Sequence, residues 1–150
     1  MHTSIRKSSG FTLVELIVAM VIAAILAAVA IPAYSNYVRK ARRTEAKTAL
    51  LDMASLEERY FSVNNQYSST ATDIGYAAWP VTVGSGSGDY SIAISNVAAA
   101  VAGTPGTPAT YTLTATAIND QFKDTLCTTF TLTQAGQQTS SDTTNNSCWR

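Results

Sequence analysis

The stretch GFTLVELIVAMVIAAILAAVAIPAY, residues 10–34, decides the fold of this chain. From Phe11 to Ile31 it is apolar except for Thr12 and Glu15. These 21 residues rise about 1.5 Å each in a helix, or roughly 32 Å in all, which matches the hydrocarbon thickness of a bilayer. A carboxylate inside that thickness costs on the order of 2 to 3 kcal/mol or more, so Glu15 needs a partner or a function.

Two ordinary interpretations of this segment leave residues unexplained. Arg6 and Lys7, with no acid in the first ten residues, are typical of an export signal. A conventional signal peptide would be cut after the small residues AVA at 28–30, yet this apolar core is too long and contains Glu15. A plain membrane anchor also gives Glu15 no role.

A cut directly after Gly10 is the third interpretation. Phe11 would then be the new N-terminus, with its amine one helical turn from Glu15. The stretch resembles the class III signal and N-terminal helix of type IV pilins at Gly10, Phe11, Thr12, Leu13, Glu15 and Pro32. The resemblance implies leader cleavage between Gly10 and Phe11 and N-methylation of Phe11. It also implies an assembly role for Glu15, which would pair with the Phe11 amine of an adjacent subunit.

The orientation of the segment rests on two opposing signals. The positive-inside rule weighs Arg6 and Lys7 against four basic residues within 39–43, and counting alone would make the second flank cytoplasmic. The export-like leader and the two cysteines near the C-terminus favour the opposite orientation. We adopt the exported orientation for the domain.

One long helix is expected from Phe11 to about Ser62. Pro32 predicts a helix kink near residues 28–32, because proline removes a backbone donor and clashes with the preceding turn. Polar residues, Glu57 among them, mostly separate an apolar stripe with helical spacing, which suits packing against a sheet. The stripe consists of Ala46, Ala49, Leu50, Met53, Leu56 and Tyr60.

Three later segments alternate apolar and polar residues, as half-buried strands do: Tyr90–Ser95, Tyr111–Ala117 and Thr129–Thr133. A fourth strand is possible at Trp79–Val83. A small antiparallel sheet of this kind needs its apolar face covered, and the amphipathic helix supplies the cover. The predicted class is therefore α+β, a long N-terminal helix packed on a small sheet.

The expected divisions follow from these elements. They are a leader at 1–10, a transmembrane and filament-core helix at 11–31, its amphipathic continuation at 32–62, an αβ-loop at 63–89, and the sheet with the C-terminal cysteine loop at 90–150.

Cys127 and Cys148 predict one disulfide, because an even count behind a membrane-targeting segment indicates an oxidising compartment. Two unrelated free thiols are the alternative. The bond would close a loop around the last strand and the polar tail, and would stabilise the fold by about 3 kcal/mol. The pilin resemblance also implies a cysteine-bounded C-terminal loop, and the CW pair near the end looks like a subgroup of minor pilins.

The charge pattern gives no direct indication of a nucleic-acid partner. The formal net charge is zero and charged residues make up 13% of the chain. The basic stretch VRKARRTEAK, residues 38–47, is compatible with a nucleic-acid patch. Since the usual aromatic platforms are absent, we interpret it as a solvated helix face in which Arg42 or Arg43 pairs with Glu45 and with neighbouring subunits.

No catalytic, cofactor-binding or metal-binding residues are predicted, and the chain is not expected to be an enzyme. His2, the single histidine, lies in the leader, so Ser–His and Cys–His nucleophile pairs cannot form after cleavage. Glu57 and Glu58 are adjacent and diverge by about 100° on a helix. The GSGSG loop at 84–88 lacks the Lys-Ser/Thr of a phosphate loop.

The resemblance implies a structural subunit, a major or minor pilin, of a type IV pilus. Its partners would be other pilin subunits, the prepilin peptidase/methyltransferase, the pilus assembly machinery and, before assembly, the bacterial inner membrane. The subunit would pass once through that membrane, with its globular domain periplasmic, and then enter the extracellular pilus. Such pili serve adhesion, twitching motility, DNA uptake or secretion.

Two alternatives remain open at this point. A pseudopilin of a type II secretion system shares the leader and stem, although its C-terminal loop is commonly fixed by calcium. A secreted binding module with a conventional signal peptide would be cut near Ala30 instead of after Gly10.

Overall fold

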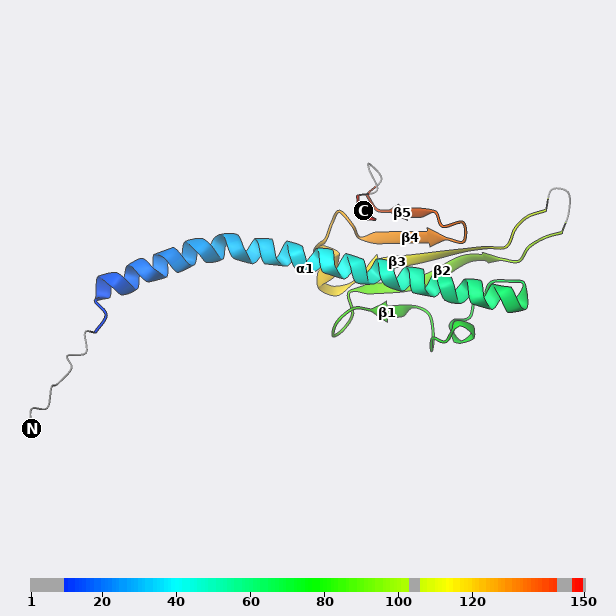
Figure 1. Cartoon of the computed structure of the whole chain (residues 1–150), viewed down its shortest axis with the longest axis horizontal. Coiled ribbons are helices and arrows are strands. Elements are labelled where there is room, and N and C mark those ends of the chain that lie inside the picture. Colours follow the sequence, from blue (N-terminus) through cyan, green and yellow to red (C-terminus); the bar gives the residue numbers. More distant parts are fainter. Residues whose placement is uncertain (1–9, 103–105, 143–146, 150) are drawn as a thin grey trace, which may run out of the picture. The chain divides into compact units, whose positions relative to one another are not determined.

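The computed structural model describes residues 10–102, 106–142 and 147–149. The chain divides into two compact units between Val38 and Arg39. Helix α1, Leu13–Asn64, contributes its first part to one unit and its second part to the other (Figure 1).

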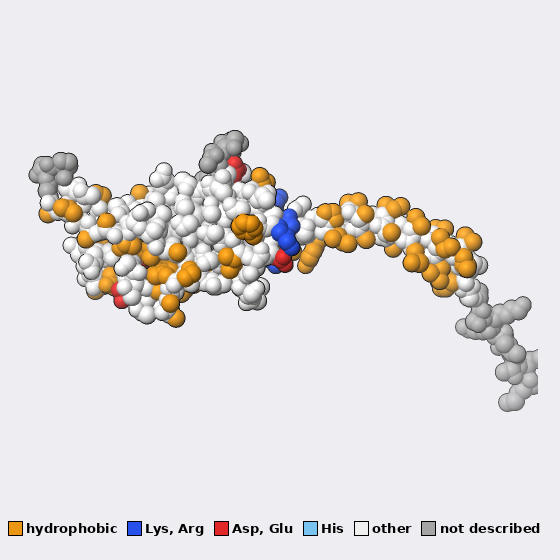
Figure 2. Space-filling view, turned by 180° about the vertical axis from the view of Figure 1, so that it is seen from behind, with side chains coloured by type: hydrophobic (Ala, Val, Ile, Leu, Met, Phe, Trp, Pro, Cys, Tyr) orange, Lys and Arg blue, Asp and Glu red, His pale blue; other side chains and the backbone are white. Residues whose placement is uncertain are grey.

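The described part of the first unit, residues 10–38, consists largely of an apolar, exposed helix. Every residue from Phe11 to Tyr34 is exposed, and hydrophobic side chains follow one another along the helix surface (Figure 2). An 18-residue window has a mean hydropathy of 2.9, and none of it is buried. By length and composition the helix can therefore cross a membrane. A surface this apolar needs lipid or another protein around it.

Pro32 lies inside α1 without ending it. Helical structure is continuous through residues 28–38, and the Ser35 hydroxyl donates a hydrogen bond to the Pro32 carbonyl over 2.9 Å. The expectation that the helix continues past the proline is confirmed. The kink stays a prediction.

The second unit contains a five-stranded antiparallel sheet in the order β1-β2-β3-β4-β5, so each strand pairs with the next along the chain. Its strands are β1 (Val81–Val83), β2 (Tyr90–Ala98), β3 (Thr110–Ala117), β4 (Thr129–Thr133) and β5 (Gln138–Ser140). Two short 3-10 helices, η1 (Ala71–Ile74) and η2 (Asn119–Lys123), lie in the connections.

The core forms where α1 covers one face of the sheet. Ala46, Leu50 and Met53 are fully buried at helical spacing and pack against the inward side chains of the central strands. Burying a side chain such as Leu50 contributes roughly 1.5 to 3 kcal/mol. The inward strand residues are Tyr90, Ile92, Tyr111, Leu113, Ala115, Ala117, Phe130 and Leu132. The α+β prediction, with a helix covering a small sheet, is confirmed.

The strand boundaries differ from the expected ones mainly at the edges. β4 has the predicted bounds, and β3 begins one residue early. β2 runs on to Ala98 past an irregularity in pairing with β3, at which Asn96 has a φ of 51°. β1 is shorter than the predicted strand. β5 was not predicted, because its exposed residues QTS carry no alternation.

Helix α1 also ends later than expected, at Asn64 instead of about Ser62. Asn65 follows with a φ of 58°, and its N–H donates to the Phe61 carbonyl over 2.8 Å. Asparagine tolerates this left-handed conformation and closes helices in this way. The segment before β2 then contains η1 and β1, in agreement with an irregular loop holding one short strand.

The C-terminal loop is closed on the core by a disulfide between Cys127 and Cys148, as predicted. The bonded loop encloses β4 and β5. Trp149 packs edge-to-face on Phe130, with ring centroids 5.6 Å apart, and its indole N–H donates to the Thr139 carbonyl over 2.7 Å. The CW pair therefore holds the polar strand β5 in place.

Replacing Cys127 or Cys148 with serine should lower the free energy of unfolding by about 2 to 4 kcal/mol, because the unfolded chain regains the entropy of an open loop. Urea unfolding of the full chain in detergent, without reductant, measures the change. Reduction of the wild-type chain should cause a similar loss. Unchanged unfolding midpoints in both serine variants would contradict a stabilising bond.

Candidate functional site

The expected cleavage site lies just before α1. Phe11 is 82% exposed and precedes the first helical residue, Leu13. No described heavy atom lies within 4 Å of a Cβ built on Gly10. The described fold does not itself require glycine at this position, so a requirement for it would come from an enzyme that binds the segment.

Thr12 caps the start of α1. The Glu15 N–H donates to the Thr12 Oγ1 over 3.3 Å, and the Leu16 N–H donates to the Thr12 carbonyl over 3.2 Å. A threonine followed three residues later by glutamate is a capping-box signature, which our sequence analysis missed. Glu15 therefore also stands where the positive end of the helix dipole favours a carboxylate. It makes no ion pair with any described residue.

Helix α1 is tied to the loops of the domain by two arginine–aspartate pairs. The Arg43 Nε and Nη2 atoms each lie 2.6 Å from an oxygen of Asp124. The Arg42 Nε lies 3.1 Å from Asp89. The expected pairing of these arginines with Glu45 was wrong, because their side chains reach the loops beside the sheet. The hydrogen bonds to Asp124 raise the pKa of Arg43.

Gln121, which is fully buried, extends this network. Its side-chain amide lies within hydrogen-bonding distance of the Asp124 carboxylate (3.0 Å) and the Tyr90 hydroxyl (3.1 Å). The Tyr90 hydroxyl donates to the Cys127 carbonyl over 3.2 Å. The contacts connect η2, β2 and the disulfide to the helix through polar groups.

A buried carboxylate lies further along α1. Glu57 is 0% exposed; its Oε2 accepts the Ser68 N–H over 3.0 Å, and its Oε1 has no hydrogen-bond partner among the described residues. Burial raises the pKa of Glu57, and the nearby Asp73 and Glu58 charges add to the rise. Glu57 was expected among the polar residues that separate the apolar stripe, but it is buried and lies one turn after Met53 on that stripe.

Three basic residues of α1 meet the C-terminal loop. Lys40, Arg43 and Lys47 recur at three- and four-residue steps. With Thr44, Ser147 and Cys148 they line a pocket of about 270 Å³. Partial burial, and then the Arg43 charge, lower the pKa of Lys47. The stretch that we interpreted as a solvated face thus contributes to a pocket.

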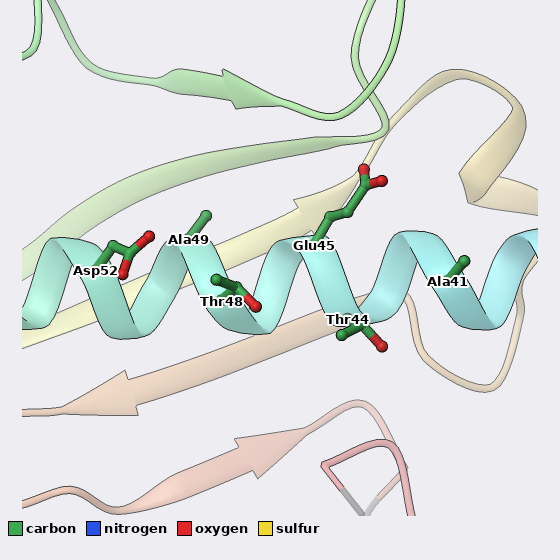
Figure 3. A pocket seen from close by; sticks show the side chains of 6 residues that line it. All are labelled: Ala41, Thr44, Glu45, Thr48, Ala49 and Asp52. Atoms are coloured by element: carbon green, nitrogen blue, oxygen red, sulfur yellow. The ribbon is translucent and has the colours of Figure 1, made fainter.

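A second hollow follows one side of α1 (Figure 3). It is a shallow groove of about 590 Å³, and all but one of its lining residues are exposed. They are Ala41, Thr44, Glu45, Thr48, Ala49 and Asp52. Small side chains at helical spacing let another backbone approach closely.

The described residues contain no candidate metal-binding site. Within residues 10–102, 106–142 and 147–149 there is no group of three or more His, Cys, Asp or Glu side chains that could hold an ion.

Two family profiles match the chain. The profile described as "Type IV minor pilin ComP, DNA uptake sequence receptor" matches residues 32–131. The profile described as "Prokaryotic N-terminal methylation motif" matches residues 5–31.

Individual relatives match chiefly over the N-terminal part. The type IV major pilin protein PilA of Myxococcus xanthus is 38% identical over 71 residues, which is 47% of this chain and 32% of the relative. The fimbrial protein EcpC of Eikenella corrodens is 33% identical over 101 residues, 67% of this chain and 60% of the relative. The chain thus spans about a third of the first relative and less than two thirds of the second.

Among solved structures, a type IV pilin from Shewanella oneidensis is similar, with a TM-score of 0.47 and 23% identity. The superposition covers 75% of this chain and 98% of that pilin.

Replacing Glu57 with glutamine should stabilise the domain at neutral pH. Because the folded pKa of Glu57 is raised above its ordinary value of 4.5, the folded chain binds this proton more tightly than the unfolded chain does. The free energy of unfolding then falls as the pH rises from 4.5 through the folded pKa, by about 1.4 kcal/mol per unit of the rise.

Urea unfolding at acid and neutral pH tests this, with Glu45→Gln, an exposed site on the same helix, as the matched control. Glu57→Gln should remove the fall in stability, and Glu45→Gln should leave it in place. A Glu57→Gln variant less stable than wild type at neutral pH would contradict the assignment.

Proposed function

The chain belongs to the type IV minor pilin family whose profile is described as ComP, DNA uptake sequence receptor, and from that premise we propose how it is matured, assembled and used. It is a type IV pilin subunit, a structural protein and not an enzyme. Its family implies processing by a prepilin peptidase. The family and the apolar N-terminal helix also imply that the subunit lies first in the inner membrane and then in the pilus.

Maturation begins with cleavage between Gly10 and Phe11 and N-methylation of Phe11 by the prepilin peptidase/methyltransferase. Two observations support this proposal. The N-terminal methylation profile matches residues 5–31, and Gly10 and Phe11 are exposed and precede the first helical residue. Released from the leader, Phe11 and Thr12 can extend α1 by part of a turn toward the new amine.

The exposed apolar surface of the first unit carries the proposal for assembly. In the membrane, this helix spans the bilayer once with the domain on the periplasmic side. In the filament, the same surface packs against the helices of other pilin subunits. Contacts of the head-to-tail kind that do not close a ring generate such a filament. The pilus assembly machinery supplies the work of extraction from lipid.

Glu15 is proposed to set the axial alignment of neighbouring subunit helices in this packing. Because two charges in an apolar medium are tolerated only as a pair, its carboxylate would neutralise the amine of Phe11. The partner amine belongs to the same subunit before assembly and to an adjacent subunit in the filament.

A pseudopilin role remains the alternative within the family. The C-terminal loop is closed by the Cys127–Cys148 disulfide. A loop fixed covalently does not need the calcium that commonly fixes the pseudopilin loop. This difference favours a pilus over a secretion system.

A second role, contact with DNA, is favoured by the description of the matching family as a DNA uptake sequence receptor. We propose that this domain contacts DNA as part of the pilus. The match covers residues 32–131, which include the basic positions on α1.

Replacing Gly10 with valine should block maturation while leaving the fold intact, since no described atom lies near a Cβ at Gly10. The intact mass of the purified subunit should keep the ten-residue leader and lack the methyl group. Ser9→Ala serves as the neighbouring control. Normal removal of the leader from Gly10→Val chains would rule out cleavage at this bond.

Replacing Glu15 with valine should leave insertion and cleavage unchanged and should reduce incorporation into filaments strongly, because the Phe11 amine would stay unpaired. Glu15→Asp, which keeps the charge, should retain part of the incorporation. Immunoblots of sheared pili against membranes measure both variants. Efficient incorporation of the valine variant would refute the pairing role.

A further inference from the structure

Positive charge in the domain is neutralised unevenly. Arg42, Arg43 and Lys123 pair with aspartates over 3.1, 2.6 and 2.7 Å. Lys40 and Lys47 make no ion pair with any described residue. Much of the domain face shown in Figure 2 is uncharged, and its basic side chains gather at one end. Lys40 and Lys47 are therefore two cations of α1 whose charge no described acid neutralises.

These cations converge on the pocket that α1 forms with the C-terminal loop. Lys40 and Lys47 lie seven residues apart, about two helical turns, with Arg43 between them. All three line the pocket of about 270 Å³. The disulfide holds Cys148, which lines the pocket together with Ser147, against the core.

The donors left free in this pocket are cationic. Arg43 uses Nε and Nη2 for Asp124, and its Nη1 has no described hydrogen-bond partner. The hydroxyl of Thr44 already donates to the Lys40 carbonyl, and that of Ser147 donates to Asp142. Two ammonium groups and one guanidinium edge therefore remain for a ligand.

Electrostatics favour an anion here. Lys47 is partly desolvated and lies near a second cation, so its charged form is destabilised. Asp124 is paired with Arg43, and the Asp142 carboxylate accepts the Ser147 hydroxyl. An anion beside Lys47 would offset the effect of desolvation and of the Arg43 charge on this side chain.

We infer that Lys40, Arg43 and Lys47 form a binding site for the phosphodiester backbone of nucleic acid. The inference rests on the proposed contact with DNA and names the residues that make it. Ammonium and guanidinium groups are the usual partners of phosphate oxygens. Among the described residues, the pocket is lined by no aromatic, Asn or Gln side chain. Contacts of the three basic side chains with phosphate groups would position DNA and carry no sequence information directly.

The test is binding of a short fluorescein-labelled DNA duplex to the mature full chain in zwitterionic detergent, measured by anisotropy between about 50 and 200 mM salt. The slope of log K against log salt is negative, and each lost phosphate contact reduces its magnitude by about 0.9. Lys40→Ala combined with Lys47→Ala should therefore reduce the magnitude by about 1.8. Binding should weaken alike for every duplex sequence.

Two controls accompany the double variant. Arg59→Ala removes an exposed cation of the same helix outside the pocket and should keep the wild-type slope. Lys40→Arg with Lys47→Arg keeps the charge and should also keep it. Thermal unfolding of all variants should match wild type, because the fold does not depend on these exposed and half-buried lysines.

Each other outcome overturns a specific statement. If the wild type binds the duplex and the double alanine variant keeps its slope, this pocket is not the site, although the DNA role stands. If the wild type binds no duplex at about 50 mM salt, the DNA role falls and this assignment with it. Displacement of the duplex by micromolar inorganic phosphate at constant ionic strength would reassign the pocket to the free ion.

Discussion

The burial of one stripe of α1 against the sheet is the constraint on which the domain depends. Ala46, Leu50 and Met53 have 0% exposure and pack on the apolar face of the sheet. Tyr67 and Trp149 contact the same core from outside the helix. A sheet of this size is not stable with that face in water. The helix, in turn, has an apolar stripe only along this part, so helix and sheet require each other.

The same helix carries the opposite requirement in the first unit. There, apolar residues occupy every side and none is buried. No stripe exists that could turn toward a sheet, and a medium that surrounds the helix is required. One helix therefore has two parts. The second part removes its apolar side chains from water by packing on the sheet of the same chain, whereas the first part can do so only in lipid or against other chains. This division explains why family membership and apolarity together point to a membrane form and a filament form.

Most of the fold was predicted from the periodic spacing of apolar residues along the sequence. The alternation in β3 and β4 and the three- and four-residue spacing on α1 reflect burial of one face, so both could be inferred without a structure. β5 could not, because its pairing with β4 is held by the turn, Trp149 and the disulfide rather than by apolar side chains of its own. The burial of Glu57 was not predicted, because a carboxylate can be buried on the stripe only with a hydrogen-bond donor, and that donor is the Ser68 N–H, outside the helix. The partners of Arg42 and Arg43 lie far along the chain and leave no local signal.

The formal net charge of the chain does not test the proposed phosphate site. A neutral chain lacks the long-range field that steers nucleic acid toward a protein. Charges beyond about 8 to 10 Å are screened at physiological salt, however, so a phosphate group responds to the few cations beside it. Pairing of Arg42 and Lys123 with aspartates removes their charge from this local balance, whereas Lys40 and Lys47 keep theirs. The formal net charge, which is a sum over the sequence, counts these four side chains equally. A domain built in this way would hold DNA by contact and would depend on the pilus, rather than on its own field, to meet it.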